Sequence, residues 1–108
     1  MVVTTIGAKS GIPRRLPLFS FLDGEKFILI GSSFGRKHNP GWYYNLRANP
    51  NCQLEYEGVE KNYLAREAEG EERDTYWQQA IDSYVGYKNY AEWANHRKIP
   101  VMVLEESD

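Results

Sequence analysis

A succession of short β-type segments, each ended by turn residues, most restricts the folds open to this chain. "MVVTTIG" ends at Gly7, "IPRRLPLFSFL" runs up to the dipeptide Asp23-Gly24, and "KFILIGSS" follows that dipeptide. Asp-Gly between apolar runs is a strong signal for a β-hairpin, so the three segments predict an antiparallel meander. Pro13 and Pro17 place the middle segment at an edge or a bulge, because proline has no N–H to donate to a neighbouring strand.

The second half of the chain repeats the β-type pattern. "CQLEYEG" and "EKNYLAREAE" predict a hairpin around Gly58, and "KIPVMVLE" predicts a last strand. Three helical patterns interrupt the strands. The first covers residues 40–48, with Asn39 as N-cap and Pro40 at the first helical position. The second, amphipathic, covers residues 71–84, and the third covers residues 87–97 before Pro100. Strands and helices together predict a mainly β fold with α-helices, a small antiparallel barrel with the helices packed outside.

Length and composition narrow the class of protein. The chain has 108 residues, which fits a single domain over residues 1–108. Cys52 is its one cysteine, so we expect no intrachain disulfide and no cysteine-based zinc site. Its two histidines are too few for a convincing metal site. No apolar run approaches the ~20 residues of a membrane span.

Charge is distributed unevenly along the sequence. Residues 1–50 carry seven Lys and Arg against two acids, whereas residues 51–108 carry six against thirteen. The first half is therefore suited to hold an anion. The net charge of the whole chain is −2, which argues against nucleic acid as the partner.

Two segments in the basic half have the composition of anion sites. In "TTIGAKSGIPRR", backbone N–H groups of a glycine-containing turn, Lys9 and Arg14 are suited to hold a phosphate. In "GSSFGRKHNP", the hydroxyls of Ser32 and Ser33 and several cations precede the start of a helix, where anions bind readily. The alternative is a plain hairpin turn in the first segment, and helix capping with a flexible loop in the second.

Aromatic side chains form a second group of candidates. Within "NPGWYYNLRANP", Trp42 is suited to lie against a planar ring while Asn45 and Arg47 hydrogen-bond. The alternative is that Trp42 and Leu46 form the core face of that helix. A spacing of three also separates four aromatic residues in "DSYVGYKNYAEW". They are either core residues or the wall of a pocket for a flat ligand: Tyr84, Tyr87, Tyr90 and Trp93.

The sequence contains no nucleophile-elbow motif, no metal-binding motif and no obvious Ser/His/Asp set. With few acid–base groups but many aromatics and anion donors, a cofactor that carries its own chemistry is the simplest explanation.

Three stretches resemble one protein family in order and spacing. They are "TTIGAKSGIPRRLPL", "GSSFGRKHNPGWYYNLRANP" and "RDTYWQQAIDSYVGYKNYAEWANHRKIPVMVLE", which together span essentially the whole chain. The sequence is thereby similar to the deazaflavin-dependent nitroreductases, split β-barrel oxidoreductases of actinobacteria that use coenzyme F420. One departure from the family pattern is Ala8, where members often carry a second cation.

The resemblance implies an FMN-binding-like split β-barrel and an F420H2-dependent reductase of the nitroreductase or quinone reductase type. Such an enzyme transfers a hydride from the reduced 8-hydroxy-5-deazaflavin to a quinone, a nitroaromatic or an activated enone. Tyr87 is the implied hydrogen-bond donor to the acceptor. The other implied catalytic residues are Tyr84, Tyr90 and Ser32, and the implied cofactor-binding residues are Lys9, Arg14, Ser32, Ser33, Trp42 and Asn45.

Three alternatives stay open at the level of sequence. The barrel would bind FMN in place of F420, or act as a carrier without turnover, or present the tyrosine row as an interface for a protein partner. We expect a small-molecule acceptor, no nucleic acid, and either a monomer or a dimer. Relatives carry an N-terminal helical segment that the given residues lack. Because no apolar run is long enough for a membrane span, we expect a cytoplasmic protein, with peripheral contact at the inner face of the membrane as the alternative.

Overall fold

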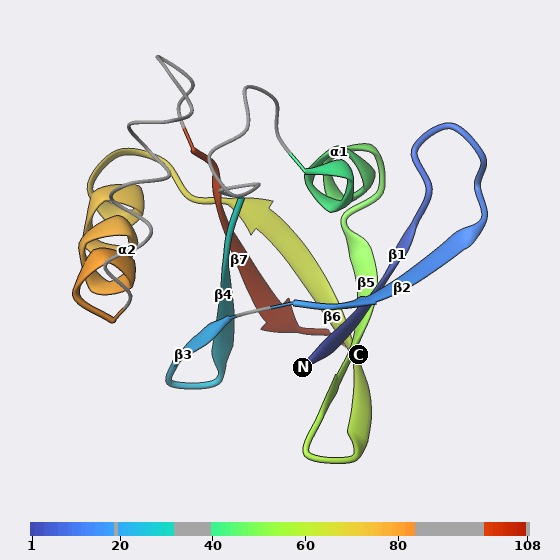
Figure 1. Cartoon of the computed structure of the whole chain (residues 1–108), viewed down its shortest axis with the longest axis horizontal. Coiled ribbons are helices and arrows are strands. Elements are labelled where there is room, and N and C mark those ends of the chain that lie inside the picture. The colour runs from blue at the N-terminus through green and yellow to red at the C-terminus, as the bar shows by residue number, and fades with distance from the viewer. Residues whose placement is uncertain (19, 32–39, 84–98, 108) are drawn as a thin grey trace.

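The computed structural model describes residues 1–18, 20–31, 40–83 and 99–107. Within these residues one antiparallel sheet has the strand order β2-β1-β5-β6-β7-β4-β3 (Figure 1). The strands are β1 (Val2–Ile6), β2 (Pro13–Pro17), β3 (Phe21–Asp23), β4 (Lys26–Ile30), β5 (Asn51–Tyr56), β6 (Val59–Glu67) and β7 (Val101–Glu106). The helices are α1 (Gly41–Ala48) and α2 (Gly70–Ser83). This is the mainly β fold with α-helices that the sequence predicts.

The connection between β2 and β3 requires the sheet to curl. These two strands are the opposite edges of the sheet, yet only residues 18–20 separate Pro17 from Phe21. Four backbone steps span at most about 14 Å. In a flat sheet, seven strands at ~4.8 Å spacing would place the two edges about 29 Å apart. The sheet therefore bends around on itself, and one bent stretch of chain supplies both of its edges.

This connection corrects the predicted meander. The β1–β2 and β3–β4 pairings are as predicted, and Pro13 and Pro17 lie on an edge strand. The prediction of one strand over residues 12–22 is wrong, because β2 and β3 lie at opposite edges and β4 pairs with β7 instead. The predicted hairpin around Gly58 is confirmed. Its turn residues Glu57 and Gly58 have φ of 53° and 81°, the left-handed pair that a tight two-residue hairpin needs.

Two apolar clusters lie on the two faces of the sheet. The concave cluster combines inward-facing strand residues with side chains of α1: Val3, Phe27, Leu29, Trp42, Tyr43, Leu46, Cys52, Leu54, Tyr63, Ala65, Met102 and Leu104. The convex cluster lies under α2: Ile28, Ile30, Ala68, Tyr76, Ala80, Ile99, Val101 and Val103. Strands β4 and β7 contribute to both clusters, which explains why their sequences are continuous apolar runs and not alternating ones.

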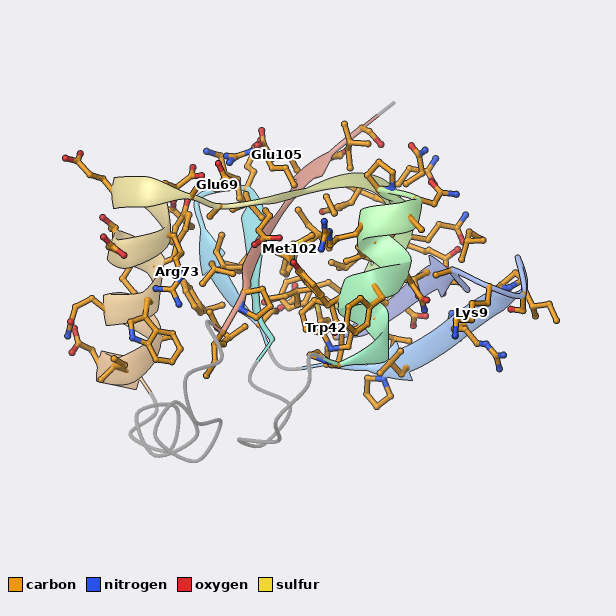
Figure 2. All side chains as sticks on the ribbon, turned by 90° about the horizontal axis from the view of Figure 1, so that it is seen from above. Lys9, Trp42, Glu69, Arg73, Met102 and Glu105 are labelled. Carbon is orange, nitrogen blue, oxygen red and sulfur yellow. The ribbon has the colours of Figure 1, made fainter. Side chains whose placement is uncertain are left out.

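Helix α1 departs from its prediction in two respects. Helix α2 packs outside the sheet as predicted, but α1 supplies part of the concave core and is not an outer layer (Figures 1 and 2). Helix α1 begins at Gly41, so Pro40 is its N-cap residue, at φ −66° and ψ 153°, and not its first helical residue. Asn39 and the helix predicted over residues 87–97 lie outside the described residues.

Candidate functional site

The strand registers gather most candidate residues at one end of the sheet. Strands β1, β4 and β6 end there, at Ile6, Ile30 and Glu67, while β2, β5 and β7 begin there. Helix α1 immediately precedes β5, so we call this the α1 end. The tight hairpin turns after β3 and β5 lie at the opposite end. The sheet therefore separates an end with long connections from an end with short ones.

The connections at the α1 end carry the predicted site residues. The β1–β2 turn carries Lys9, and α1 carries Trp42 and Asn45. The segment 32–39 leaves from Gly31, and the segment 84–98 ends just before Ile99. Gly31 N–H donates to the Pro100 carbonyl at 2.9 Å, so these two segments attach to the sheet side by side.

Several predicted residues lie outside the described part of the chain. For their segments, the structure gives only the flanking residues on the sheet. They are Ser32, Ser33, Tyr84, Tyr87, Tyr90 and Trp93.

The two adjacent arginines of β2 face opposite sides of the sheet. Arg15 pairs with Thr4 in the register and forms ion pairs with Glu55 at 2.5 Å and Glu60 at 3.5 Å on the convex face. Arg14 pairs with Thr5, which is fully buried on the concave face. Because side chains alternate along a strand, Arg14 belongs to the face that also carries α1. Among the described residues, Arg14 has no ion-pair partner.

Lys9 lies at the tip of the arm formed by β1 and β2. It is exposed, and like Arg14 it has no ion-pair partner in the described residues. Figure 2 shows this arm beside α1. The two cations and the nearby helix make a basic region whose charge no described acid neutralises. A ligand with an anionic group fits such a region.

Trp42 is mainly a core residue. Its side chain is 8% exposed and packs in the concave cluster with Leu29 and Met102 (Figure 2). Leu46 is buried in the same cluster, so the alternative of a helix core face is what the structure shows. Only a small part of the indole is left to contact a bound ring, and the role of Trp42 toward a cofactor stays a prediction.

Asn45 makes hydrogen bonds to two parts of the β1–β2 hairpin. Its Oδ1 accepts from the Ala8 backbone N–H at 2.9 Å, and its Nδ2 donates to Thr5 Oγ1 at 3.1 Å. The amide is thereby largely occupied within the protein. Thr5 is not among the site residues predicted from the sequence. The available signal was a threonine at an inward-facing position of a strand, where an apolar residue would ordinarily lie.

Tyr43 ties α1 to β6 and was also not singled out from the sequence. Its hydroxyl donates to Glu67 Oε1 at 2.6 Å, and Arg47 lies over its ring at 5.7 Å. Burial, and then the hydrogen bond to Glu67, raise the pKa of Tyr43. The phenol is therefore neutral at physiological pH and serves as a structural donor between the helix and the sheet.

Two hollows are lined by described residues. One of about 480 Å³ lies over β1, β5 and β6, and its lining reaches the α1 end at Ile6, Pro13 and Asn51. The other, about 460 Å³, lies at the hairpin end between Asp23 and Glu106. Within the described ranges, no three acidic, His or Cys side chains group together as metal ligands, and neither helix is long and apolar enough to cross a membrane.

Comparison with known proteins gives a consistent result. The family model for F420H(2)-dependent quinone reductase matches residues 1–106. An F420H(2)-dependent quinone reductase of Mycobacterium tuberculosis is 31% identical over 107 residues, which cover 96% of this chain and 71% of that protein. A solved F420-H2 dependent reductase is 36% identical, with a TM-score of 0.86 over 96% of this chain and 91% of the other. A second solved structure, described as a domain-swapped dimer, has the same identity and TM-score and is covered to 78%.

Proposed function

The chain belongs to the family of F420H(2)-dependent quinone reductases, and from this premise we propose that it reduces a quinone-type small molecule with coenzyme F420 as hydride donor. The α1 end of the sheet would hold the cofactor. Lys9 and Arg14 would bind its anionic tail, which carries a phosphodiester and an oligoglutamate chain. One observation supports this assignment above the others: Arg14 lies on the concave face without an acidic partner among the described residues, whereas its neighbour Arg15 is paired twice on the convex face.

The described residues fit such a tail in charge and position. A guanidinium binds phosphate or carboxylate through two parallel N–H groups, and a lysine adds a mobile point charge. Both side chains are exposed, so an anion can reach them from solvent. Since the two hydrogen-bonding positions of the Asn45 amide hold the β1–β2 hairpin against α1, the cations are presented from a fixed arm.

When bound, reduced coenzyme F420 supplies the hydride. The protein's own contribution is to orient the two reactants and to keep water out of the space between them. We propose that Tyr87 donates a hydrogen bond to the acceptor oxygen, with Tyr84 and Tyr90 beside it and Ser32 and Ser33 near the cofactor. A tyrosine with an ordinary pKa near ~10 is suited to stabilise developing negative charge on that oxygen.

A fluorescence titration with oxidised F420 tests the proposal, run on the wild type and on matched arginine variants. Arg14→Ala should weaken binding about 10- to 150-fold, the ~1.5–3 kcal/mol of one charge-assisted hydrogen bond. Arg15→Ala removes the same charge one residue away on the other face and should change the dissociation constant less than about twofold. Equal losses in both variants would mean that only general charge matters, and the assignment of Arg14 would be wrong.

Two further measurements separate the remaining alternatives. FMN titrated in parallel should bind far more weakly than F420, and binding of FMN alone would contradict the proposed cofactor. Oxidation of F420H2 with a quinone under steady-state conditions distinguishes an enzyme from a carrier. Since one relative is described as a domain-swapped dimer, the molar mass of the protein should be measured under the titration conditions.

A further inference from the structure

We propose that Asn45 is a positioning residue: its side chain holds the β1–β2 turn, and Lys9 within that turn, in place. The inference rests on the proposed function, because it concerns how the basic arm is prepared for an anion. It adds a positioning role to the cofactor contact that the family resemblance implies for Asn45.

The geometry around Asn45 is that of a strut between two elements far apart in the sequence. One end of its amide accepts from the backbone N–H of Ala8 at 2.9 Å, 37 residues away. The other end donates to Thr5 Oγ1 at 3.1 Å, 40 residues away. Thr5 is the one buried polar residue in the described core, with no exposed surface. A buried hydroxyl without a partner is costly, so this hydrogen bond is needed for the fold itself.

The hydrogen-bonding capacity of an asparagine limits what else Asn45 can do. Its side chain has one carbonyl oxygen and two N–H groups. The Ala8 N–H is a donor and fixes the oxygen on that side, and Thr5 takes one N–H on the other. One N–H is left for a ligand. Turning the amide toward a cofactor would break two internal hydrogen bonds, including that of the buried threonine.

The β1–β2 turn depends on this strut for its placement. Within the turn, Gly7 N–H donates to the Ile12 carbonyl at 2.9 Å, and Gly11 N–H donates to the Gly7 carbonyl at 2.9 Å. These hydrogen bonds keep the turn compact but do not attach it to the rest of the molecule. Among the described residues, Asn45 is the side chain from another element that is hydrogen-bonded to the turn. It therefore decides where Lys9, the residue after Ala8, is presented.

Arg14 lies next to the same strut. It is the register partner of Thr5, and Lys9 follows Ala8, so each cation neighbours one of the two residues that Asn45 holds. In the described sheet, β2 is an edge strand paired with β1, and the end of a hairpin with few other contacts opens more readily than the core strands. A fixed arm pays less ordering entropy when an anion binds, which is the physical benefit that we assign to Asn45.

A mutant cycle between Asn45 and Lys9 tests the inference by F420 fluorescence titration. Asn45→Ala should weaken binding about fivefold to tenfold, and Lys9→Ala should weaken it at least as much. In the double variant we expect a loss clearly smaller than the product of the two single losses, because Asn45 acts through the placement of that lysine. If the losses multiply instead, Asn45 contacts the cofactor independently and the inference is wrong.

Amide hydrogen exchange without cofactor gives a second readout. The Ala8 amide should lose protection in Asn45→Ala, while amides of β5 and β6 keep theirs. Asn45→Asp still accepts from Ala8 and should restore the protection, which guards against a variant that simply misfolds. Loss of Ala8 protection with unchanged F420 affinity would overturn the positioning role.

Failure of the proposed function gives a different pattern. In that case Lys9→Ala and Arg14→Ala both leave the F420 affinity unchanged. Lys9 then has no part in binding, and a role of Asn45 through Lys9 is excluded as well.

Discussion

Removing the hydroxyl of Tyr76 should lower the stability of the protein at neutral pH but not at high alkaline pH. This phenol, on α2, donates to Asp23 Oδ2 at 2.6 Å and thereby joins the outer helix to the β3–β4 hairpin. The hydrogen bond to Asp23, and then burial, raise the pKa of Tyr76 to about 12. We therefore expect Tyr76→Phe to lower the free energy of unfolding. The size of this loss should depend on whether the wild-type phenol is protonated.

The magnitude follows from the pKa and from the surroundings of the two groups. A rise from 10.0 to about 12 corresponds to at most about 2.7 kcal/mol. Tyr76 is only 5% exposed, and a phenylalanine ring at this position keeps its apolar contacts, so no cavity is added. Asp23 is exposed and returns to water when its partner is lost, which avoids the penalty of a stranded buried charge. We expect a net loss of about 1–1.5 kcal/mol, or a Tm lower by ~4–8 °C.

The sign of the pH dependence is fixed by the direction of the pKa change. The unfolded chain loses the Tyr76 proton near pH ~10, while the folded protein keeps it up to about pH 12. This contribution is complete below pH ~10 and is lost as the pH rises toward 12.

Urea denaturation at pH 8, 10, 11 and 12 measures the effect. The difference between the wild type and Tyr76→Phe should be largest at pH 8 and should shrink toward zero at pH 12. Asp23→Asn is the matched control, because it removes the carboxylate that accepts from Tyr76. The loss of stability at alkaline pH should therefore be smaller in this variant as well. A difference that stays constant from pH 8 to pH 12 would refute the reasoning.

Three further predictions concern the packing of the barrel. Gly31→Ala should destabilise the protein by about 1–3 kcal/mol, measured by thermal denaturation, because an added Cβ would lie 2.6 Å from Pro100 Cγ, and an unchanged Tm would contradict the tight approach of β4 to β7. Leu54→Ala should cost about 2–5 kcal/mol in urea denaturation, whereas Leu64→Ala, at 47% exposure, should cost less than ~0.5 kcal/mol; similar costs would place the core elsewhere. Cys52 should react with a thiol reagent only after denaturation, because it is buried and burial raises its pKa to about 11; rapid labelling of the folded protein would show that the interior opens.

The sequence by itself determined most of the local structure. The Asp23-Gly24 dipeptide and Gly58 indicated two hairpins, since glycine readily adopts the left-handed backbone of tight turns, here with φ of 61° at Gly24 and 81° at Gly58. Proline at positions 13 and 17 identified an edge strand, because a proline nitrogen has no hydrogen to donate. These signals are local, so they can be read from a few neighbouring residues.

The sequence also indicated which class of ligand and which class of enzyme to expect. Seven Lys and Arg in the first fifty residues predicted an anion, and the order of three motifs predicted a deazaflavin reductase. The family match over residues 1–106 confirms the family. The individual residues within the site were less well defined, because a motif lists residue types without saying which face each one occupies.

Only the tertiary structure decided how these pieces meet. Strand order separated β2 from β3 across the sheet, and register sent Arg14 to the concave face and Arg15 to two carboxylates on the convex face. The contact between Asn45 and Thr5 joins residues 40 apart. No periodicity within either segment reveals such a contact, because its existence depends on the curl of the whole sheet and on the placement of α1 against it.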